Sequence, residues 1–115
     1  MDPFQYESEL ETYSEGQTIF KEGDSGRTMY VVAEGEVEVQ VRGETIESID
    51  KGGIFGEMAL LGSALRSATA VACKDTRLLV IDDQFFLHLI QQSPHFSIQV
   101  MKVMADRLRR LNQRI

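Results

Sequence analysis

The sequence predicts a mostly β protein, an eight-stranded antiparallel β-roll of the jelly-roll type with one short inserted helix and two helices at the C-terminus. Short apolar segments rich in β-branched residues recur between about residue 11 and residue 82, and turns that contain glycine separate them. After residue 82 the apolar residues take a helical spacing. With 115 residues and no internal repeat, we expect a single domain over residues 1–115, with the roll at about 11–82 and the C-terminal helices at about 83–113.

Composition and charge disfavour several classes of function. The net charge of −6 argues against nucleic-acid contact by this domain, because phosphate backbones attract clustered Lys and Arg. No apolar segment has membrane-spanning length, and we expect no signal peptide. The one cysteine, Cys73, cannot form an internal disulfide, so we expect a cytoplasmic, reducing environment. We interpret Cys73 as a small buried strand residue, with a reactive thiol as the alternative.

Charge is distributed unevenly along the chain. Residues 1–57 carry four basic and fourteen acidic side chains, a charge of −10, whereas residues 58–115 carry eight basic and four acidic side chains, a charge of +4. The acidic part is typical of solvated strand faces. The basic part includes a helix that could contact an acidic partner or the acidic half of its own chain.

The first third of the chain predicts strands and one turn. Residues 1–14 have no clear period, so we predict only a short frayed helix or an arm. Glu15–Phe20 is predicted as a strand, and the glycines and aspartate of residues 22–26 indicate a turn. Thr28–Glu34 contains the apolar run Met29-Tyr30-Val31-Val32, which is typical of a central strand.

Residues 35–50 predict a hairpin. In Gly35–Arg42 valines alternate with polar residues, which favours a half-buried antiparallel strand. Arg42-Gly43-Glu44 indicates a tight turn, and we expect Thr45–Asp50 to continue the alternation through Ile46 and Ile49.

Two further strands are predicted after residue 67. Alanines alternate with larger residues over 68–73, which leaves room on one face for either a bound ligand or a facing aromatic ring. Thr76–Asp82 contains the run Leu78-Leu79-Val80-Ile81 and predicts the last strand.

The C-terminal part predicts two helices. Asp82 or Asp83 can cap the first, and Ser93-Pro94 supplies a second cap with proline at the first helical position. The second helix carries a heptad seam that either packs on the roll or in part covers a ligand or pairs with a second copy of the chain. The seam consists of Met101, Met104, Leu108, Leu111 and Ile115, and beside it lie Arg107, Arg109, Arg110 and Arg114.

The stretch Phe55–Ala70, FGEMALLGSALRSATA, has a composition that suits an anion. Gly56 has no Cβ and lets the backbone approach a ligand. Met58–Leu61 can form one helical turn whose first N–H groups lack partners, and we expect Gly62 to end that turn in a left-handed conformation. Arg66 carries a planar fork of donors that can grip two phosphate oxygens.

A carboxylate in the same stretch needs a separate explanation, because it repels phosphate. Glu57 is suited to accept hydrogen bonds from hydroxyls beside that phosphate, such as a ribose 2′-hydroxyl. Taken alone, Glu57 and Arg66 would be interpreted as a surface pair. The whole stretch favours a binding site instead.

This stretch resembles the phosphate-binding cassette of cyclic nucleotide-binding domains, as found in regulatory subunits of cAMP-dependent kinase, bacterial catabolite activator protein and cyclic nucleotide-gated channels. The resemblance runs from Gly56-Glu57-Met58-Ala59-Leu60 to Arg66-Ser67-Ala68-Thr69. It implies that Glu57 holds the ribose 2′-hydroxyl, that Arg66 binds the cyclic phosphate, and that Ser67 and the Met58 and Ala59 backbone complete the site. The candidate site residues are Phe55, Gly56, Glu57, Met58, Ala59, Arg66, Ser67 and Ala68.

Two positions bear on how closely the family pattern is followed. Leu65 stands where many members carry proline, which leaves the loop less constrained and removes no ligand-binding group. A Ser or Thr at the position of Ser67 can bond to a guanine amino group in the family, yet several bacterial cAMP-binding members also have it. The sequence leaves cAMP and cGMP open, and we favour cAMP because the nearest similar sequences are bacterial.

No catalytic or metal centre is predicted. A metal-dependent β-barrel enzyme would need two or three histidines and a carboxylate on strands, whereas His88 and His95 fall in predicted helices. Ser63, Ser67 and Cys73 have no histidine near them in sequence to serve as a base.

The sequence therefore predicts a non-enzymatic regulatory sensor that binds a cyclic nucleotide and transmits binding through movement of its C-terminal helices. The alternative is a ligand-free β-roll that serves as a protein-interaction or dimerisation domain. The expected partners are the cyclic nucleotide, a second copy through the C-terminal helix, and an effector domain outside this chain. We expect the effector outside because no effector motif follows Ile115.

Overall fold

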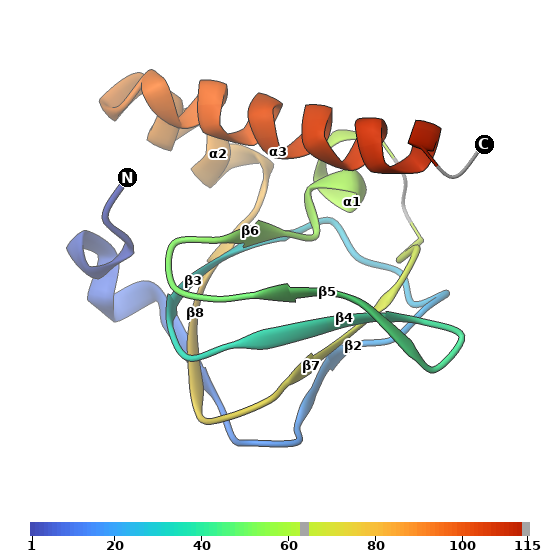
Figure 1. Ribbon diagram of the computed structural model, residues 1–115. Coiled ribbons are helices and arrows are strands. Elements are labelled where there is room, and N and C mark those ends of the chain that lie inside the picture. Colours follow the sequence, from blue (N-terminus) through green and yellow to red (C-terminus); the bar gives the residue numbers. More distant parts are fainter. Residues whose placement is uncertain (63–64, 114–115) are drawn as a thin grey trace.

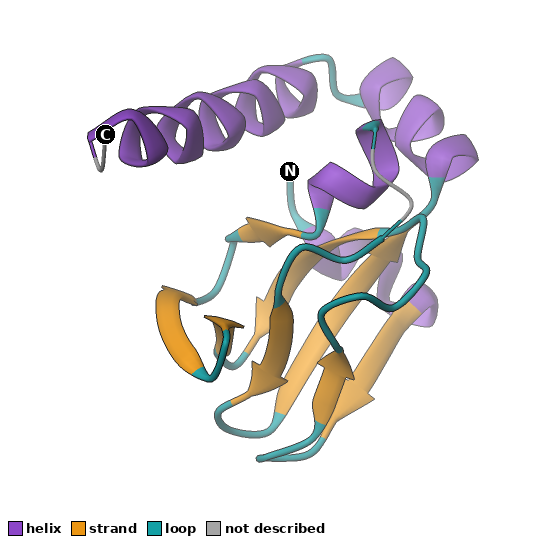
Figure 2. Ribbon diagram, turned by 90° about the vertical axis from the view of Figure 1, so that its right-hand side faces the viewer, coloured by secondary structure: helices purple, strands orange, loops and turns teal. Residues whose placement is uncertain are grey.

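The computed structural model describes residues 1–62 and 65–113. Within these ranges, eight strands form two four-stranded antiparallel sheets, and α1, α2 and α3 gather on one side of the roll (Figures 1 and 2). The arrangement confirms the predicted β-roll with C-terminal helices. No helix of the described ranges is long and apolar enough to cross a membrane.

The first sheet has the strand order β1-β8-β3-β6. Its strands are β1 (Leu10–Tyr13), β8 (Thr76–Ile81), β3 (Met29–Glu34) and β6 (Ile54–Phe55). Every residue of β3 except the last is buried, because β3 lies between two neighbours and has packed layers on both faces. The prediction of a central strand here is confirmed.

The second sheet has the strand order β2-β7-β4-β5. Its strands are β2 (Thr18–Phe20), β7 (Thr69–Ala72), β4 (Val37–Val41) and β5 (Glu44–Ile49). The predicted hairpin is confirmed: β4 and β5 pair antiparallel and are joined at Arg42-Gly43, where φ is 54° and 82°. Positive φ at both central residues is typical of the two-residue turns that match the twist of the paired strands.

One detail of the hairpin prediction is wrong. Ile46 is 42% exposed, whereas Ile49 is 4% exposed. These residues are three positions apart, so they lie on opposite faces of β5, and the alternation cannot include both. Glu47 shares the inward face with Ile49, and this places its carboxylate within reach of α3.

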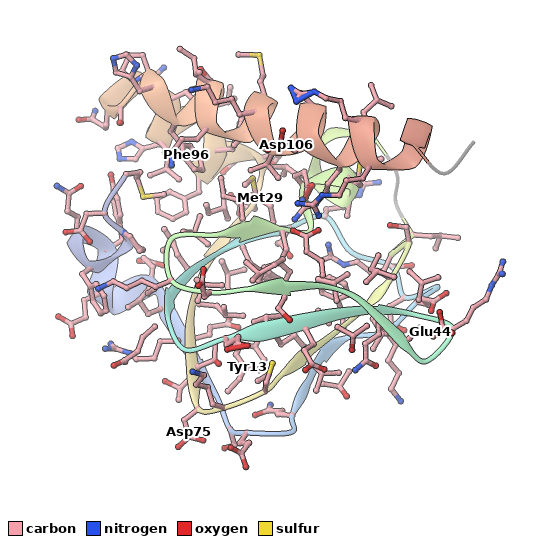
Figure 3. All side chains as sticks on the ribbon, viewed as in Figure 1. Tyr13, Met29, Glu44, Asp75, Phe96 and Asp106 are labelled. Carbon is pink, nitrogen blue, oxygen red and sulfur yellow. The ribbon has the colours of Figure 1, made fainter. Side chains whose placement is uncertain are left out.

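Two hydrophobic clusters fill the interior, and successive residues of β3 supply them alternately. Met29 and Val31 point into the cluster between the first sheet and the helices, which also contains Phe96 and Val100 (Figure 3). The next residues along the strand belong to the cluster between the two sheets. That cluster consists of Tyr30, Val32, Val37, Ile49, Phe55, Ala70 and Leu78.

The N-terminal segment is more ordered than the expected frayed helix or arm. A 3₁₀ helix, η1 (Pro3–Glu9), is capped by Asp2, whose carboxylate accepts from the Phe4 N–H at 3.0 Å. The chain then enters β1, which pairs with β8. Tyr6 packs edge-on against Phe85 with ring centroids 5.2 Å apart, so η1 is fixed to the first C-terminal helix.

The alternating alanines of β7 are packed in the interior, whereas the prediction of Cys73 as a buried strand residue is wrong. Ala70 and Ala72 are fully buried, and Ala70 belongs to the cluster that contains aromatic rings, which fits the aromatic alternative. Cys73 is half-buried and lies one residue beyond β7, where its N–H donates to the Glu36 carbonyl at 2.9 Å. Burial, with the nearby charges of Glu38 and Glu36, raises the pKa of the Cys73 thiol.

The two C-terminal helices are confirmed. Asp82 is the N-cap of α2 (Asp83–Gln92), and its carboxylate accepts from the Phe85 N–H at 2.8 Å. The second helix, α3 (His95–Gln113), begins one residue after Pro94, within the usual uncertainty of helix bounds.

Of the two alternatives for the heptad seam, packing on the roll is wrong for two of its members. Met101 is 57% exposed and Leu108 is 59% exposed. Leu111 lies in α3, but its side chain, together with Arg114 and Ile115, lies outside the described residues.

The face of α3 that packs inward carries Phe96, Val100, Val103 and Arg107. These residues follow the same alternation of four and three positions as the seam, displaced by about one residue. Because the last member is charged, a search for apolar residues alone selects the wrong face. Met104, at the edge of the two faces, is half-buried against the first cluster.

Candidate functional site

The segment that connects β6 with β7 begins on a glycine in the left-handed conformation. Gly56 is the N-cap of α1 (Glu57–Leu61) and has a φ of 79°, which a residue with a side chain rarely adopts. A Cβ there would lie 3.1 Å from Arg66 Nη1 and 3.2 Å from the Thr28 carbonyl oxygen. The expected left-handed stop at Gly62 is wrong, since its φ is −171°, although its N–H closes the helical turn on Met58.

The backbone of Arg66 is held by the turn at residues 22–26. The Arg66 N–H donates to the Asp24 carbonyl at 2.8 Å, and the Gly23 N–H donates to the Arg66 carbonyl at 2.8 Å. The turn predicted from two glycines and an aspartate therefore has a structural role, because it fixes where the Arg66 side chain leaves the backbone.

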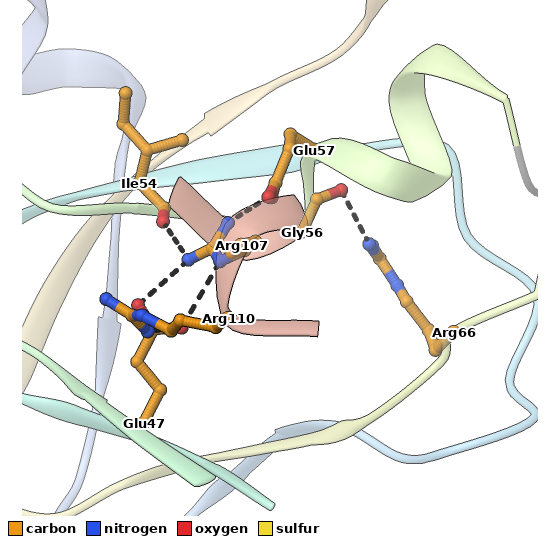
Figure 4. Close-up of polar contacts among 7 residues, drawn as sticks. All are labelled: Glu47, Ile54, Gly56, Glu57, Arg66, Arg107 and Arg110. Atoms are coloured by element: carbon orange, nitrogen blue, oxygen red, sulfur yellow. Dashed lines mark hydrogen bonds and ion pairs between the residues drawn. The ribbon is translucent and has the colours of Figure 1, made fainter. Parts of the chain in front are cut away.

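The Arg66 side chain is buried, with 6% exposure, beneath the start of α1. Nη1 donates to the Thr28 carbonyl at 2.8 Å and to the Gly56 carbonyl at 3.3 Å, and Nη2 donates to Thr28 Oγ1 at 3.0 Å (Figure 4). The guanidinium carbon lies 4.1 Å from the Phe20 ring centroid and 5.6 Å from that of Tyr30. These contacts hold the cation without neutralising it.

The positive charge of Arg66 is not compensated by an ion pair. No carboxylate of residues 1–62 or 65–113 forms an ion pair with it, and its Nε is buried without a hydrogen-bond partner in the same ranges. Burial lowers the pKa of the Arg66 guanidinium from its ordinary value, and the charges of Tyr30 and Asp24 partly oppose that effect. A buried cation with a free donor provides favourable conditions for an anion.

Glu57, the first residue of α1, is also buried, with 1% exposure. Its partner is not Arg66 but Arg107 of α3, whose Nη1 donates to Glu57 Oε1 (Figure 4). The interpretation of Glu57 and Arg66 as a surface pair is therefore wrong. The two side chains lie on different sides of Gly56, and each has its own partners.

Arg107 donates hydrogen bonds to three residues: Glu47 of β5, Ile54 of β6 and Glu57 of α1. Besides Glu57, it donates from Nη2 to the Ile54 carbonyl at 2.8 Å, and it contacts both carboxylate oxygens of Glu47 at 3.2 Å. Arg110 adds a second ion pair to Glu47 at 3.2 Å. The basic helix thus contacts the acidic half of its own chain. This is one of the two alternatives predicted from the charge distribution, the other being an acidic partner.

An open cavity of about 180 Å³ lies beside these contacts, between β5, β6 and α3. Its lining combines the apolar residues Ile49, Ile54 and Val103 with the ion-paired Glu47 and Arg107. The lining also includes Ser48, Asp50, Asp106 and Arg110, so polar and charged side chains make up most of it.

The remaining predicted residues are divided between core and surface. Phe55 is 1% exposed and stacks on Tyr30 with ring centroids 4.9 Å apart, so its side chain supports the site from the core. Ala59 is buried, Ala68 is half-buried, Ser67 is exposed, and Met58 is 55% exposed. The Ala59 N–H donates to the Gly56 carbonyl at 3.3 Å.

The residues considered for metal binding or catalysis belong to several separate parts of the chain. Within the described ranges, no group of three or more His, Cys, Asp or Glu side chains could hold a metal ion. His88 of α2 contacts the ring of Tyr6 in η1 and the ring of Phe85 in its own helix. Ser63 lies outside the described residues.

Sequence reasoning missed three contributors to the site. Thr28 supplies two of the acceptors for Arg66, and Phe20 supplies the ring beneath it, but neither belongs to a recognisable motif. Arg107 could have been found, because it continues the spacing of Phe96 and Val100 as a charged residue on an apolar face.

Comparisons with known proteins connect this geometry to a family. The family model described as the cyclic nucleotide-binding domain matches residues 10–93. The cyclic AMP receptor protein of Thermus thermophilus is 38% identical over 102 residues, which are 84% of this chain and 47% of that protein. The chain therefore spans about half the length of that relative.

Solved structures show the same similarity in three dimensions. The catabolite activator protein of Thermus thermophilus superposes with a TM-score of 0.79 and 36% identity, over 90% of this chain and 51% of that chain. A structure described by the words "A cyclic-GMP-dependent signalling pathway regulates bacterial phytopathogenesis" gives a TM-score of 0.73 and 27% identity, over 86% of this chain and 82% of that one.

Proposed function

The chain belongs to the cyclic nucleotide-binding domain family, and from this premise we propose that it is a regulatory sensor that binds cAMP through Arg66 and Glu57 and signals through its C-terminal helices. In this proposal residues 1–115 act as one non-enzymatic domain in the cytoplasm. The whole protein's output depends on an effector domain outside this chain.

The observation that carries the proposal is the buried charge of Arg66, which has no ion-pair partner among the described residues, together with its Nε, which has no hydrogen-bond partner among them. A cyclic phosphate carries one negative charge and two free oxygens, so it would supply both the missing charge and the missing acceptor. The carboxylate of Glu57, on the other side of Gly56, would accept a hydrogen bond from the ribose 2′-hydroxyl. Met58, Ala59, Ser67 and Ala68 complete the proposed set at the edge of the site.

The contact between Glu57 and Arg107 supports a role for α3 in signalling. A ribose hydroxyl that donates to Glu57 would change what Arg107 contacts, and Arg107 belongs to α3. A ligand shifts a conformational equilibrium only through groups that it contacts differently in the two states. Glu57 is such a group, because it is shared between the proposed ligand site and the helix.

The choice of cAMP rests on the relative named cyclic AMP receptor protein, which is 38% identical to this chain. The structure from a cyclic-GMP-dependent pathway is less similar, at 27% identity, and Ser67 is compatible with either base. We therefore propose cAMP as the preferred ligand and cGMP as the weaker one.

A second copy of the chain is the proposed protein partner. Ile98, Met101 and Leu108 expose apolar surface on α3, with 43%, 57% and 59% of each residue accessible. Apolar residues repeated on one helix favour helix pairing. We propose no nucleic-acid contact by this domain, because its net charge is −6.

Calorimetric titration of the chain with cAMP and with cGMP tests the proposal. We expect saturable binding of both nucleotides at one site, with cAMP bound more tightly. The absence of binding by either nucleotide would contradict the sensor and favour the ligand-free interaction domain. Tighter binding of cGMP would leave the sensor intact and overturn the choice of base.

A further inference from the structure

We infer that Glu47 on β5 is a positioning residue for the ligand site: its carboxylate holds the Arg107 side chain, and through it α3, beside Glu57. This inference rests on the proposed function. Glu47 lies outside the stretch Phe55–Ala70, and no sequence pattern singles it out.

The contact between Arg107 and Glu47 is bidentate. Arg107 Nε donates to one oxygen of Glu47 and Nη2 to the other, both at 3.2 Å. This two-point contact uses one edge of the guanidinium and leaves Nη1, which donates to Glu57. Because a guanidinium is planar, fixing one edge also fixes the direction in which the remaining donor points.

Burial indicates how the two carboxylates divide their roles. The Glu57 side chain is 2% exposed, so its charge depends on a partner inside the protein. The Glu47 side chain is 21% exposed, and it also forms an ion pair with Arg110 at 3.2 Å. Glu47 can therefore keep Arg107 on the roll when a ribose hydroxyl occupies Glu57, while Arg110 helps to hold that end of α3.

Docking of α3 depends on this polar contact. The apolar contacts of the helix involve its first half, where Phe96 and Val100 are buried. Near the other end, Leu108 is exposed, and the contacts of the described side chains with β5 include the ion pairs of Arg107 and Arg110 with Glu47. Loss of the Glu47 carboxylate should therefore free this end and misplace the Arg107 donor.

The experiment compares Glu47→Gln with Glu44→Gln, measuring the Kd of cAMP by calorimetry and the hydrogen exchange of residues 100–110. Glu44 lies on the same strand, is exposed, and forms no ion pair with a described residue, so its substitution makes the same charge change without the contact. We expect Glu47→Gln to weaken cAMP binding about three- to tenfold, the size of one ordinary hydrogen bond, because the new side chain can still accept from Arg107 through its amide oxygen but loses the charge. It should also speed exchange in residues 100–110 without ligand. Glu44→Gln should change neither.

A double-substitution cycle distinguishes positioning from direct contact with the nucleotide. If Glu47 acts through Arg107, then Glu47→Gln adds no further loss of affinity in a chain that already carries Arg107→Gln. The same loss in both backgrounds would overturn the inference. Should Glu47→Gln fail to fold, Glu47→Asp keeps the charge, shortens the side chain, and must show the same dependence on Arg107.

The outcomes separate this inference from the function on which it rests. If the unchanged chain binds neither cAMP nor cGMP, the proposed function fails. If, in addition, Glu47→Gln leaves the hydrogen exchange of residues 100–110 unchanged, the contact of Glu47 does not hold α3 on the roll. If the unchanged chain binds cAMP and Glu47→Gln binds it equally well, the role of Glu47 alone is overturned.

Discussion

The guanidinium carbon of Arg66 lies 4.1 Å from the centre of the Phe20 ring, so a cation of the connecting segment packs on an aromatic residue of β2. Tyr30 of β3 approaches the same guanidinium from the other sheet, at 5.6 Å. Rings of both sheets therefore surround the charge, and such contacts stabilise cations. The packing of the two sheets therefore helps to position this group.

Replacement of Arg66 by lysine should weaken cAMP binding at least about tenfold, because a lysine keeps the charge but loses a planar pair of donors, each contributing about 1.5–3 kcal/mol to a charged acceptor. Calorimetry gives the affinity. Arg27→Lys is the matched control. Arg27 is exposed on the loop between β2 and β3, so this substitution should leave the Kd of cAMP unchanged. Equal affinities for Arg66→Lys and the unchanged chain would refute the assignment of the phosphate site.

Gly56→Ala should lower both the free energy of unfolding and the affinity for cAMP. Its φ of 79° is unfavourable for alanine, at a cost of about 1 kcal/mol or more, and the new Cβ would crowd Arg66 Nη1 at 3.1 Å. Gly43→Ala controls for backbone strain, because Gly43 has a φ of 82° and no atom within 4 Å of its Cβ position. Urea unfolding should show the larger loss for Gly56→Ala, and equal losses would mean that crowding does not matter.

Loss of Arg107 and loss of Glu57 should lower the free energy of unfolding by different amounts. Arg107→Gln leaves a carboxylate with 1% exposure and no cation, which we expect to cost about 1–3 kcal/mol of unfolding free energy. Glu57→Gln leaves Arg107 in contact with Glu47 and the Ile54 carbonyl, so its cost should be smaller. Urea unfolding of both chains checks this order, and the reverse order would contradict it.

Nucleotide binding should slow hydrogen exchange in two separate segments, Gly56–Gly62 and residues 101–110 of α3. The first surrounds the proposed ribose contact, and the second carries Arg107, which is bonded to Glu57. Deletion of the residues after Arg107 should also weaken affinity while the roll still folds. Protection confined to Gly56–Gly62, with full affinity in the shortened chain, would show that α3 is a passive support.

Ser67→Ala should reduce the affinity for cGMP more than that for cAMP, because guanine carries a 2-amino group that can bond to the hydroxyl, whereas adenine has only a hydrogen at that position. Ser67 is exposed, so its loss should change the unfolding free energy little. A competition assay with both nucleotides measures the ratio of affinities. An unchanged ratio would remove Ser67 from the specificity of the site.

Much of the fold could be predicted because its signals are local. The apolar run of β3, the turn at Arg42-Gly43 and the cap at Asp82 each depend on residues close together in sequence. The placement of Ile46 and Ile49 on one face was predicted wrongly. Side chains alternate between the two faces of a strand, so residues three positions apart lie on opposite faces, and Ile46 is exposed.

The candidate site was predictable only in the part that lies on one segment. Glu57 and Arg66 stand in a contiguous motif, whereas Arg107 is fifty residues from Glu57 and reaches it only because α3 folds back over β6. Likewise Glu47 resembles any other exposed glutamate of a strand until the helix is in place. Partners brought together by helix packing leave no pattern in a single sequence.

Because Tyr30 lies beside Arg66, the intrinsic tyrosine fluorescence of the chain can report on this site. The sequence contains three tyrosines and no tryptophan, so tyrosine emission is not masked by a brighter fluorophore. Tyr30 is 7% exposed, contacts the guanidinium of Arg66, and has its hydroxyl 3.3 Å from Thr28 Oγ1. The other two belong to η1 and β1. A quenching or enhancement of Tyr30 emission would therefore follow events at the guanidinium in real time and without an attached dye.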